Sequence, residues 1–145
     1  MLFVRVYIHF VWSTKNRQAF LSTPDLRKIL WQHILENARK KDIYIDFIGG
    51  YSDHCHCLVS LGTEQTIREI AQLIKGESSF WINKQNLCAS KFNWQDDYFA
   101  ASVFESMIEK TRKYIKEQEE HHKKISFMDE YNDFLVKHGF KRFED

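Results

Sequence analysis

The sequence predicts an α+β fold. Some segments alternate between two faces with a period of two, and others carry apolar residues at helical spacing behind residues that cap helix starts. Residues 3–12 are the first alternating segment and predict a strand. One face of this strand is apolar and consists of Val4, Val6, Ile8, Phe10 and Trp12. The opposite face carries His9.

A helix is predicted from Pro24 to about Lys41. The Thr23 side chain can cap the first free amides, and Pro24 has the backbone torsion that the first helical position requires. The apolar stripe of this helix consists of Leu26, Ile29, Leu30, Ile34 and Ala38. Basic residues at 39–41 suit the negative end of the helix dipole.

Two more strands, a second helix and a fourth strand are predicted next. Residues 43–48 are rich in β-branched and aromatic side chains, a Gly-Gly pair breaks the pattern, and residues 54–61 alternate again. This arrangement indicates an antiparallel hairpin. Thr66 and Glu69 form a capping box that opens the second helix. After a polar connection, residues 98–103 predict the fourth strand.

Two helices are predicted at the C-terminal end. One long helix is expected over 104–124, opened by a capping box of Ser102 and Glu105. Ser126 opens a short last helix, and Gly139 is placed to end it.

The predicted order is therefore β-α-β-β-α-β followed by two helices. The first six elements match the split βαβ, or ferredoxin-like, arrangement, in which an antiparallel sheet carries two helices on one face. Because no linker interrupts the chain, we expect a single domain over 1–145, with a core at 1–103 and the C-terminal helices at 104–145. This fold hosts many unrelated functions, so function has to be argued from particular residues.

Composition excludes several classes of protein. The chain has 145 residues, of which 43% are hydrophobic, and 21 Lys and Arg residues against 20 Asp and Glu residues give a net charge of +1. Near-neutral charge provides no bulk attraction to nucleic acid. No apolar run approaches a membrane span, and three cysteines are too few for a disulfide framework. We therefore expect a cytoplasmic protein without membrane contact.

A His-x-His pair is the most informative local feature. Residues two apart on a strand point the same way, about 6.6–6.8 Å apart at their α-carbons, so His54 and His56 can converge on one cation. Most isolated His-x-His pairs bind no metal. A zinc site is disfavoured because the alternation points Cys55 and Cys57 to the opposite face.

A tyrosine and a glutamine on the expected long helix are the second feature. Tyr114 and Gln118 are four residues apart and therefore neighbours on one helical face. By itself, Tyr114 is more often a boundary tyrosine that packs its ring and leaves its oxygen in water. Gln118 alone would ordinarily be a solvated amide.

Taken together, the two features resemble the HUH single-tyrosine transposases of the insertion-sequence-200-like family, which include the REP-associated tyrosine transposases. The strand motif is Tyr51-Ser52-Asp53-His54-Cys55-His56-Cys57-Leu58-Val59, and the helix motif is Tyr114-Ile115-Lys116-Glu117-Gln118. Supporting segments lie at 9–17, 74–79 and 94–99, so the likeness covers nearly the whole chain. The sequence departs from the family at Cys55, where the family more often has a larger apolar residue.

This resemblance implies a transposase that cleaves and rejoins single-stranded DNA at insertion-sequence ends. His54, His56 and Gln118 would bind a divalent metal ion, Mg²⁺ or Mn²⁺. Tyr114 would attack phosphorus, leaving a 5′-phosphotyrosine and a free 3′-hydroxyl, and rejoining would need no ATP. The resemblance also implies a homodimer with active sites completed across subunits, and DNA hairpins as the selected substrate.

Four basic residues are expected to contact DNA, namely Lys15, Arg17, Lys75 and Lys113. The first three occupy family-like positions, and Lys113 belongs to a local excess of positive charge around Tyr114. A solvated helix face is an equally good interpretation for any individual lysine.

Three further histidines have roles that stay open. His9 would support the metal site, contact DNA or be buried with a hydrogen bond. His121 and His122 follow Gln118 on the expected helix, where surface or phosphate-contact roles are favoured over a fourth metal ligand.

Two other functions stay open. A non-enzymatic nucleic-acid-binding module of this fold would place aromatic side chains on the open sheet face, whereas the third strand here presents His54 and His56. A metal-dependent phosphoesterase that uses water would form no covalent intermediate and would be little affected by Tyr114→Phe.

Overall fold

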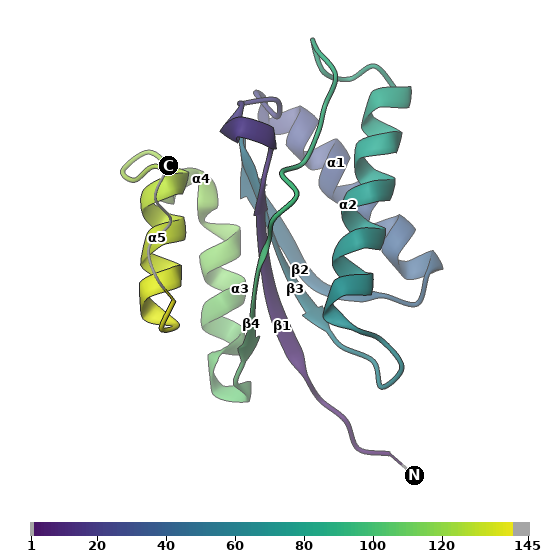
Figure 1. Ribbon diagram of the computed structural model, residues 1–145, viewed down its shortest axis with the longest axis vertical. Helices are drawn as coiled ribbons and strands as arrows, with labels where there is room; N and C mark the ends of the chain where they lie inside the picture. The colour runs from purple at the N-terminus through teal and green to yellow at the C-terminus, as the bar shows by residue number, and fades with distance from the viewer. Residues whose placement is uncertain (1, 141–145) are drawn as a thin grey trace.

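The computed structural model describes residues 2–140 and contains one four-stranded antiparallel sheet in the order β2-β3-β1-β4 (Figure 1). The strands and larger helices follow the expected sequence up to the fourth strand: β1 (Tyr7–Ser13), α1 (Pro24–Lys40), β2 (Tyr44–Tyr51), β3 (His54–Ser60), α2 (Ile67–Lys84) and β4 (Phe99–Val103). The chain then continues through α3 (Ile108–Lys116), α4 (Gln118–His121) and α5 (Phe127–Lys137). The α+β, ferredoxin-like prediction is confirmed. Residues 1 and 141–145 of the expected domain lie outside the described residues.

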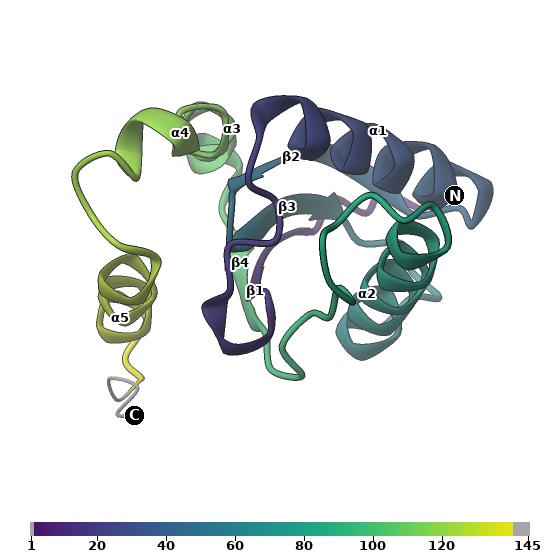
Figure 2. The ribbon, with the colours of Figure 1, turned by 90° about the horizontal axis from the view of Figure 1, so that it is seen from above.

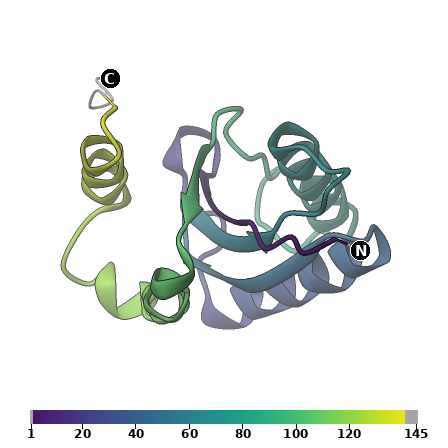
Figure 3. The ribbon, with the colours of Figure 1, turned by 90° about the horizontal axis from the view of Figure 1, so that it is seen from below.

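Both faces of the sheet are covered by helices, and a different group of helices covers each face. Helices α1 and α2 lie together on one face, and α3, α4 and α5 lie on the other (Figures 2 and 3). The two expected core helices therefore share a face, and the C-terminal helices close the face that such a core would leave open. No helix among residues 2–140 is long and apolar enough to cross a bilayer.

The strand alternation separates two different interiors. On β1 and β3, Phe10 pairs with Cys57 and Ile8 with Val59, and all four side chains belong to the apolar core under α1 and α2. Intervening residues point the other way, so the next pair, Val11 and His56, lies beneath the C-terminal helices. The two central strands thus place histidines and core residues in strict alternation.

The expected first strand begins later than predicted. Regular pairing starts at Tyr7, which faces Ser60 on one side and Val103 on the other, because both neighbouring strands end there. Before Tyr7, the Val6 carbonyl accepts a hydrogen bond from the Leu61 amide. Leu2, Phe3, Val4 and Val6 are exposed. Alternation at 3–6 was therefore a misleading signal for a strand.

The Gly-Gly pair does not break its strand. Strand β2 runs through Gly49 and Gly50 to Tyr51. A Cβ on Gly49 would lie 2.9 Å from both Cγ2 and the carbonyl oxygen of Ile115, and one on Gly50 would overlap the carbonyl oxygen of His54. The glycines therefore allow α3 to approach the sheet closely and the chain to turn tightly into β3.

The prediction of a single long helix over 104–124 is wrong. The chain instead forms a 3₁₀ turn, η2 (Glu105–Met107), then α3 and α4, which meet at a kink where Glu117 has φ −92° and ψ 15°. Ser102 lies in β4 and caps no helix. Beyond the kink, Glu119 binds Arg27 of α1 at 2.8 Å, and the Gln118 side chain turns into the interior. These contacts hold α4 against the β2 end of the sheet.

Candidate active site

His54 and His56 are completely buried on the face of β3 that the C-terminal helices cover. Their rings lie edge to face, with centroids 5.1 Å apart. Strand geometry accounts for this placement, because the two residues share a face while Cys55 and Cys57 point into the apolar core. The predicted orientation of all four side chains is confirmed.

Asp53 holds the ring of His54. Oδ1 of Asp53 lies 2.8 Å from Nδ1 of His54, so this nitrogen donates to the carboxylate. The opposite nitrogen, Nε2, lies 2.8 Å from Oε1 of Gln118. An acidic partner on Nδ1 is the usual way in which proteins direct the Nε2 lone pair of a histidine towards a metal.

His9 contacts the second histidine from β1. Its Nε2 lies 2.9 Å from Nδ1 of His56. Burial lowers the pKa of His9 to about 3 and that of His56 to about 4, so both rings are neutral at physiological pH. A neutral imidazole has one free lone pair, which is the form that binds metal. His9 therefore supports the site as a buried, hydrogen-bonded histidine.

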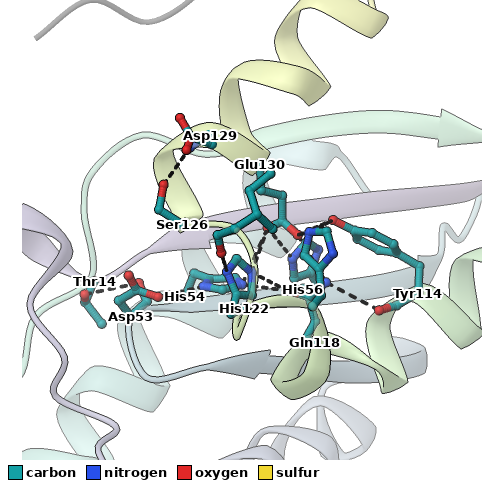
Figure 4. A network of polar contacts seen from close by, with 12 residues as sticks. Thr14, Asp53, His54, His56, Tyr114, Gln118, His122, Ser126, Asp129 and Glu130 are labelled. Carbon is teal, nitrogen blue, oxygen red and sulfur yellow. Dashed lines mark hydrogen bonds and ion pairs between the residues drawn. The ribbon is translucent and has the colours of Figure 1, made fainter.

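Tyr114 and Gln118 reach the histidines from two sides of the kink. Tyr114 lies in α3, and Gln118 is the first residue of α4 and only 1% exposed. The Tyr114 ring meets the His56 ring edge to face at 5.6 Å. The four residues expected in the site thus converge within one chain, although the helix expected to carry two of them is interrupted (Figure 4).

Glu130 lies at the centre of this cluster and was not predicted. It is 2% exposed, and its two carboxylate oxygens contact different neighbours. Oε1 lies 3.2 Å from Nε2 of His56, while Oε2 accepts a very short hydrogen bond from the Tyr114 hydroxyl and another from Nε2 of Gln118 at 3.2 Å. Helix α5, on which Glu130 lies, therefore completes the site.

A sequence signal for Glu130 did exist. Phe127, Tyr131 and Phe134 have the spacing of the buried stripe of α5, and Glu130 lies three residues after the first of them, on the same stripe. A carboxylate inside an apolar stripe has to be paired, because burying a lone charge is costly. The free-energy cost of burying an unpaired Glu130 carboxylate therefore predicts a polar partner beneath α5, although no sequence motif marks this residue.

His122 also belongs to the cluster. Its side chain is nearly as buried as that of Glu130, with Nε2 3.0 Å from Oε1 of Gln118 and 3.4 Å from Oε1 of Glu130. The surface role favoured for His122 is therefore wrong. His121 is more exposed and lies 3.2 Å from Oε2 of Glu130 and 3.4 Å from the Tyr114 hydroxyl.

Electrostatics in the cluster favour positive charge around Glu130. Burial raises the pKa of Glu130, but hydrogen bonds from His122 and His56 outweigh burial and hold it well below its usual range. Burial lowers the pKa of His122, yet the contact with Glu130 raises it overall. Burial and the adjacent Glu130 charge raise the pKa of the Tyr114 phenol. The phenol therefore stays protonated beside the carboxylate.

The donor set fits a divalent cation. His54, His122 and Glu130 each offer one ligand atom, and these atoms lie within 4.8 Å of one another. Gln118 contributes an amide oxygen, which lies 2.8 Å from Nε2 of His54. Nε2 of His56 lies 3.2 Å from Oε1 of Glu130 and is therefore next to the same group of atoms. Oxygen and imidazole donors together suit Mg²⁺ or Mn²⁺, whereas a structural zinc site would enlist the cysteines, which face away.

The expected DNA-contacting residues are dispersed, with three of them around one segment. Lys15 binds the Asn93 carbonyl through its backbone amide, and Arg17 lies two residues later in η1 (Lys15–Arg17). Lys75 of α2 donates to the carbonyls of Asp96 and Asp97 and lines a cavity of about 560 Å³. Lys113 is exposed on α3. Their contact with DNA stays a prediction.

Comparison with known families identifies the family of this chain. The sequence model of the family described as "Transposase IS200 like" matches residues 3–118, which is most of the chain. The chain therefore belongs to the IS200-like transposase family. Comparison with curated proteins found no match.

Two solved structures share the fold. One is a candidate transposase from Deinococcus radiodurans R1, with 20% identity, a TM-score of 0.62, and coverage of 81% of this chain and 93% of that chain. The other is a REP-associated tyrosine transposase bound to a REP hairpin, with 16% identity, a TM-score of 0.62, and coverage of 84% and 72%.

Proposed function

We propose that this protein cleaves and rejoins single-stranded DNA at insertion-sequence ends by metal-dependent transesterification through Tyr114. The observation that carries the proposal is the convergence of the Tyr114 hydroxyl with His54, His56 and Gln118 in one buried cluster. Membership of the IS200-like family supplies the reaction class. The cluster offers a candidate nucleophile and a set of candidate ligands for a cation, which are the two components that this reaction requires.

His54, His56 and Gln118 would hold a divalent ion, Mg²⁺ or Mn²⁺. When bound, such an ion polarises the scissile phosphate and offsets the negative charge that develops on it. Asp53 and His9 keep the two imidazole rings oriented through their Nδ1 atoms. The protein therefore contributes a prearranged set of neutral donors whose positions do not depend on exposed, mobile side chains.

Tyr114 is the nucleophile in this proposal. Its phenol oxygen forms a bond to phosphorus while the bond from phosphorus to the 3′-oxygen breaks, which leaves a 5′-phosphotyrosine and, after proton uptake, a free 3′-hydroxyl. The phenol proton is already directed at Oε2 of Glu130. Attack by a 3′-hydroxyl on the phosphotyrosine reverses the step, so strands are rejoined without an external energy source.

The proposed substrate is single-stranded DNA selected through hairpins. One structural relative is a REP-associated tyrosine transposase bound to a REP hairpin. Lys15, Arg17 and Lys75 surround the segment at 93–97 and would contact phosphates there, as Lys113 would beside Tyr114. We further propose that the chain acts as one domain and as a homodimer, in which exchange of the C-terminal helices would complete sites across subunits.

A non-enzymatic nucleic-acid-binding role fits the arrangement poorly. Such modules stack bases on aromatic side chains of an open sheet face. Here α3 and α5 pack on that face, with Leu58 beneath the former and Val11 beneath the latter. The buried polar cluster also has no purpose in a protein that only stacks bases.

The test is formation of a covalent adduct on labelled single-stranded DNA with Mn²⁺. Wild-type protein and Tyr131→Phe, a matched tyrosine of α5, are expected to form the adduct, and Tyr114→Phe is expected to form none. An adduct with Tyr114→Phe would refute the nucleophile assignment. Cleavage without any adduct, unaffected by Tyr114→Phe, would identify a phosphoesterase that uses water.

A further inference from the structure

Four acceptor atoms from four residues meet in the cluster. They are Nε2 of His54, Oε1 of Gln118, Nε2 of His122 and Oε1 of Glu130. Oε1 of Gln118 lies 2.8 Å from the His54 nitrogen and 3.0 Å from the His122 nitrogen. Oε1 of Glu130 lies 3.6 Å and 3.4 Å from the same two nitrogens. Figure 4 shows these side chains directed at one another from β3, α4, the turn after α4, and α5.

While both imidazoles are neutral, neighbouring hydrogen bonds leave these four atoms without a proton to share. Nδ1 of His54 donates to Asp53, and Nδ1 of His122 donates to the Ile125 carbonyl at 2.8 Å. In the neutral form of each ring, the single N–H is therefore used elsewhere, and Nε2 carries a lone pair.

The orientation of the Gln118 amide is fixed in the same way. Its nitrogen faces two acceptors, Oε2 of Glu130 at 3.2 Å and the Tyr114 carbonyl at 3.4 Å. Its oxygen must then face the two imidazoles. Four lone pairs directed at one another are unfavourable unless a positive charge lies between them, and a bound cation supplies that charge without protonating either imidazole.

The spacing of these atoms suits a hard divalent cation. Adjacent ligands of an octahedral ion at about 2.1 Å lie about 3.0 Å apart. The four separations, 2.8, 3.0, 3.4 and 3.6 Å, bracket that value. The charge also fits, because two histidines and an amide form a neutral set, whereas Mg²⁺ and Mn²⁺ favour carboxylate oxygens.

We infer that Glu130 and His122 are ligands of the active-site cation, so that α5 supplies the one anionic ligand of the site. This inference rests on the proposed function, whose cation site it extends by two residues. Helix α5 is held in place for this role: the Ser126 hydroxyl caps its first turn, and the Phe127 ring stacks on His54 with centroids 4.5 Å apart.

The test is calorimetric titration of the full chain with MnCl₂, without DNA. Loss of a residue that merely supports a ligand weakens metal binding 10–100-fold, so we expect Glu130→Gln to raise the dissociation constant at least about tenfold. His122→Gln is expected to act in the same direction. Asp129→Asn is the matched control, because it removes the same charge from the exposed neighbouring residue and should leave the dissociation constant unchanged.

Two further measurements guard against misfolding. Circular dichroism identifies any variant that fails to fold, and Glu130→Asp, which keeps a carboxylate on a shorter side chain, is expected to bind Mn²⁺ more tightly than Glu130→Gln. Manganese is also expected to raise the melting temperature of the wild type more than that of Glu130→Gln. An unchanged or tighter dissociation constant for folded Glu130→Gln, or a wild type that binds no Mn²⁺, would overturn the inference.

Failure of the inference can be told apart from failure of the proposed function. Adduct formation at Tyr114 together with Glu130-independent Mn²⁺ binding would leave the function standing and remove Glu130 from the ligand set. Glu130-dependent Mn²⁺ binding without any adduct would do the reverse.

Discussion

The two faces of the sheet are built from the same strands and yet do different work. Under α1 and α2, Phe10, Cys55 and Cys57 belong to the apolar core. Under the C-terminal helices, His9, His54 and His56 alternate with those residues and meet Tyr114, Gln118 and Glu130 instead. One residue along a strand separates a packing role from a chemical one.

This difference shows how a small fold can carry a polar site without losing its core. Burying apolar surface on the α1/α2 face supplies stability, while the histidine face tolerates buried polar groups because nearly all of them are paired. Substitutions on the first face should therefore change mainly stability. Substitutions on the second should change mainly chemistry and the response to pH.

The largest expected effect on stability comes from the apolar face under α1 and α2. Phe10→Ala removes a fully buried ring from the core and should lower the free energy of unfolding by about 3–5 kcal/mol. Urea denaturation measures this loss. Tyr114→Phe, on the other face, removes one hydrogen bond to a buried carboxylate and should lower the free energy of unfolding by only about 1.5–3 kcal/mol while abolishing the adduct. Equal destabilisation by both variants would break the comparison.

The histidine face should make stability sensitive to acid. Folded His56 has a pKa of about 4, so between pH 6.5 and 4 the unfolded chain binds a proton that the folded chain does not. Stability is therefore lost as the pH falls through this window, by about 3 kcal/mol for His56 alone. Below about pH 4.5 the lowered pKa of Glu130 adds a loss of the same sign.

Urea denaturation at several pH values, with a chelator present, measures this acid sensitivity. His56→Asn should make the slope between pH 6.5 and 4 shallower, and the lowered pKa of buried His9 should account for the part that remains. His33→Gln, which changes a histidine that pairs with Glu77 between α1 and α2, should leave the slope intact. A wild-type free energy that is constant across the window would contradict the account.

A smaller effect is expected where α3 meets the sheet. Gly49→Ala places a methyl group against Ile115 and should cost about 1–3 kcal/mol. Because Ile115 follows Tyr114, the same change should shift the nucleophile and reduce adduct formation beyond what the stability loss explains. Thermal unfolding and the adduct assay, performed below the melting temperature, separate the two effects. Full activity would show that α3 can move without harm.

The smallest effect is expected at the other helical layer. Gly76 lies in α2, and a methyl group added to its α-carbon would meet no atom within 4 Å, so Gly76→Ala should stabilise the protein by about 0.5–1 kcal/mol. Adduct formation should stay at the wild-type level. A lower melting temperature for Gly76→Ala would contradict this prediction and would mean that a methyl group at position 76 of α2 is unfavourable despite the open space around it.

Local patterns predicted most of the fold. Thr23 and Thr66 cap α1 and α2 as expected, and Ser126 caps α5. The errors in the predicted elements lie where contacts between residues far apart in the sequence determine the structure. Strand β1 begins only at Tyr7 because its two neighbouring strands end there, and the close approach of α3 requires a glycine at position 49 of β2.

The candidate site was predicted in part for the same reason. His54 and His56 follow from strand alternation, and Tyr114 and Gln118 from a motif that survives a kink between them. Glu130 and His122 come from segments without a recognisable motif. His122 reaches the site from the end of α4, one turn after Gln118, and Glu130 reaches it because the chain lays α5 over the sheet.

The most direct test of the central claim is mass spectrometry of the protein after reaction with single-stranded DNA and Mn²⁺, followed by peptide mapping. The account predicts one modified residue, Tyr114, carrying a 5′-linked nucleotide after nuclease trimming. A nucleotide linked to any other residue would contradict it, as would cleaved DNA with no linked protein.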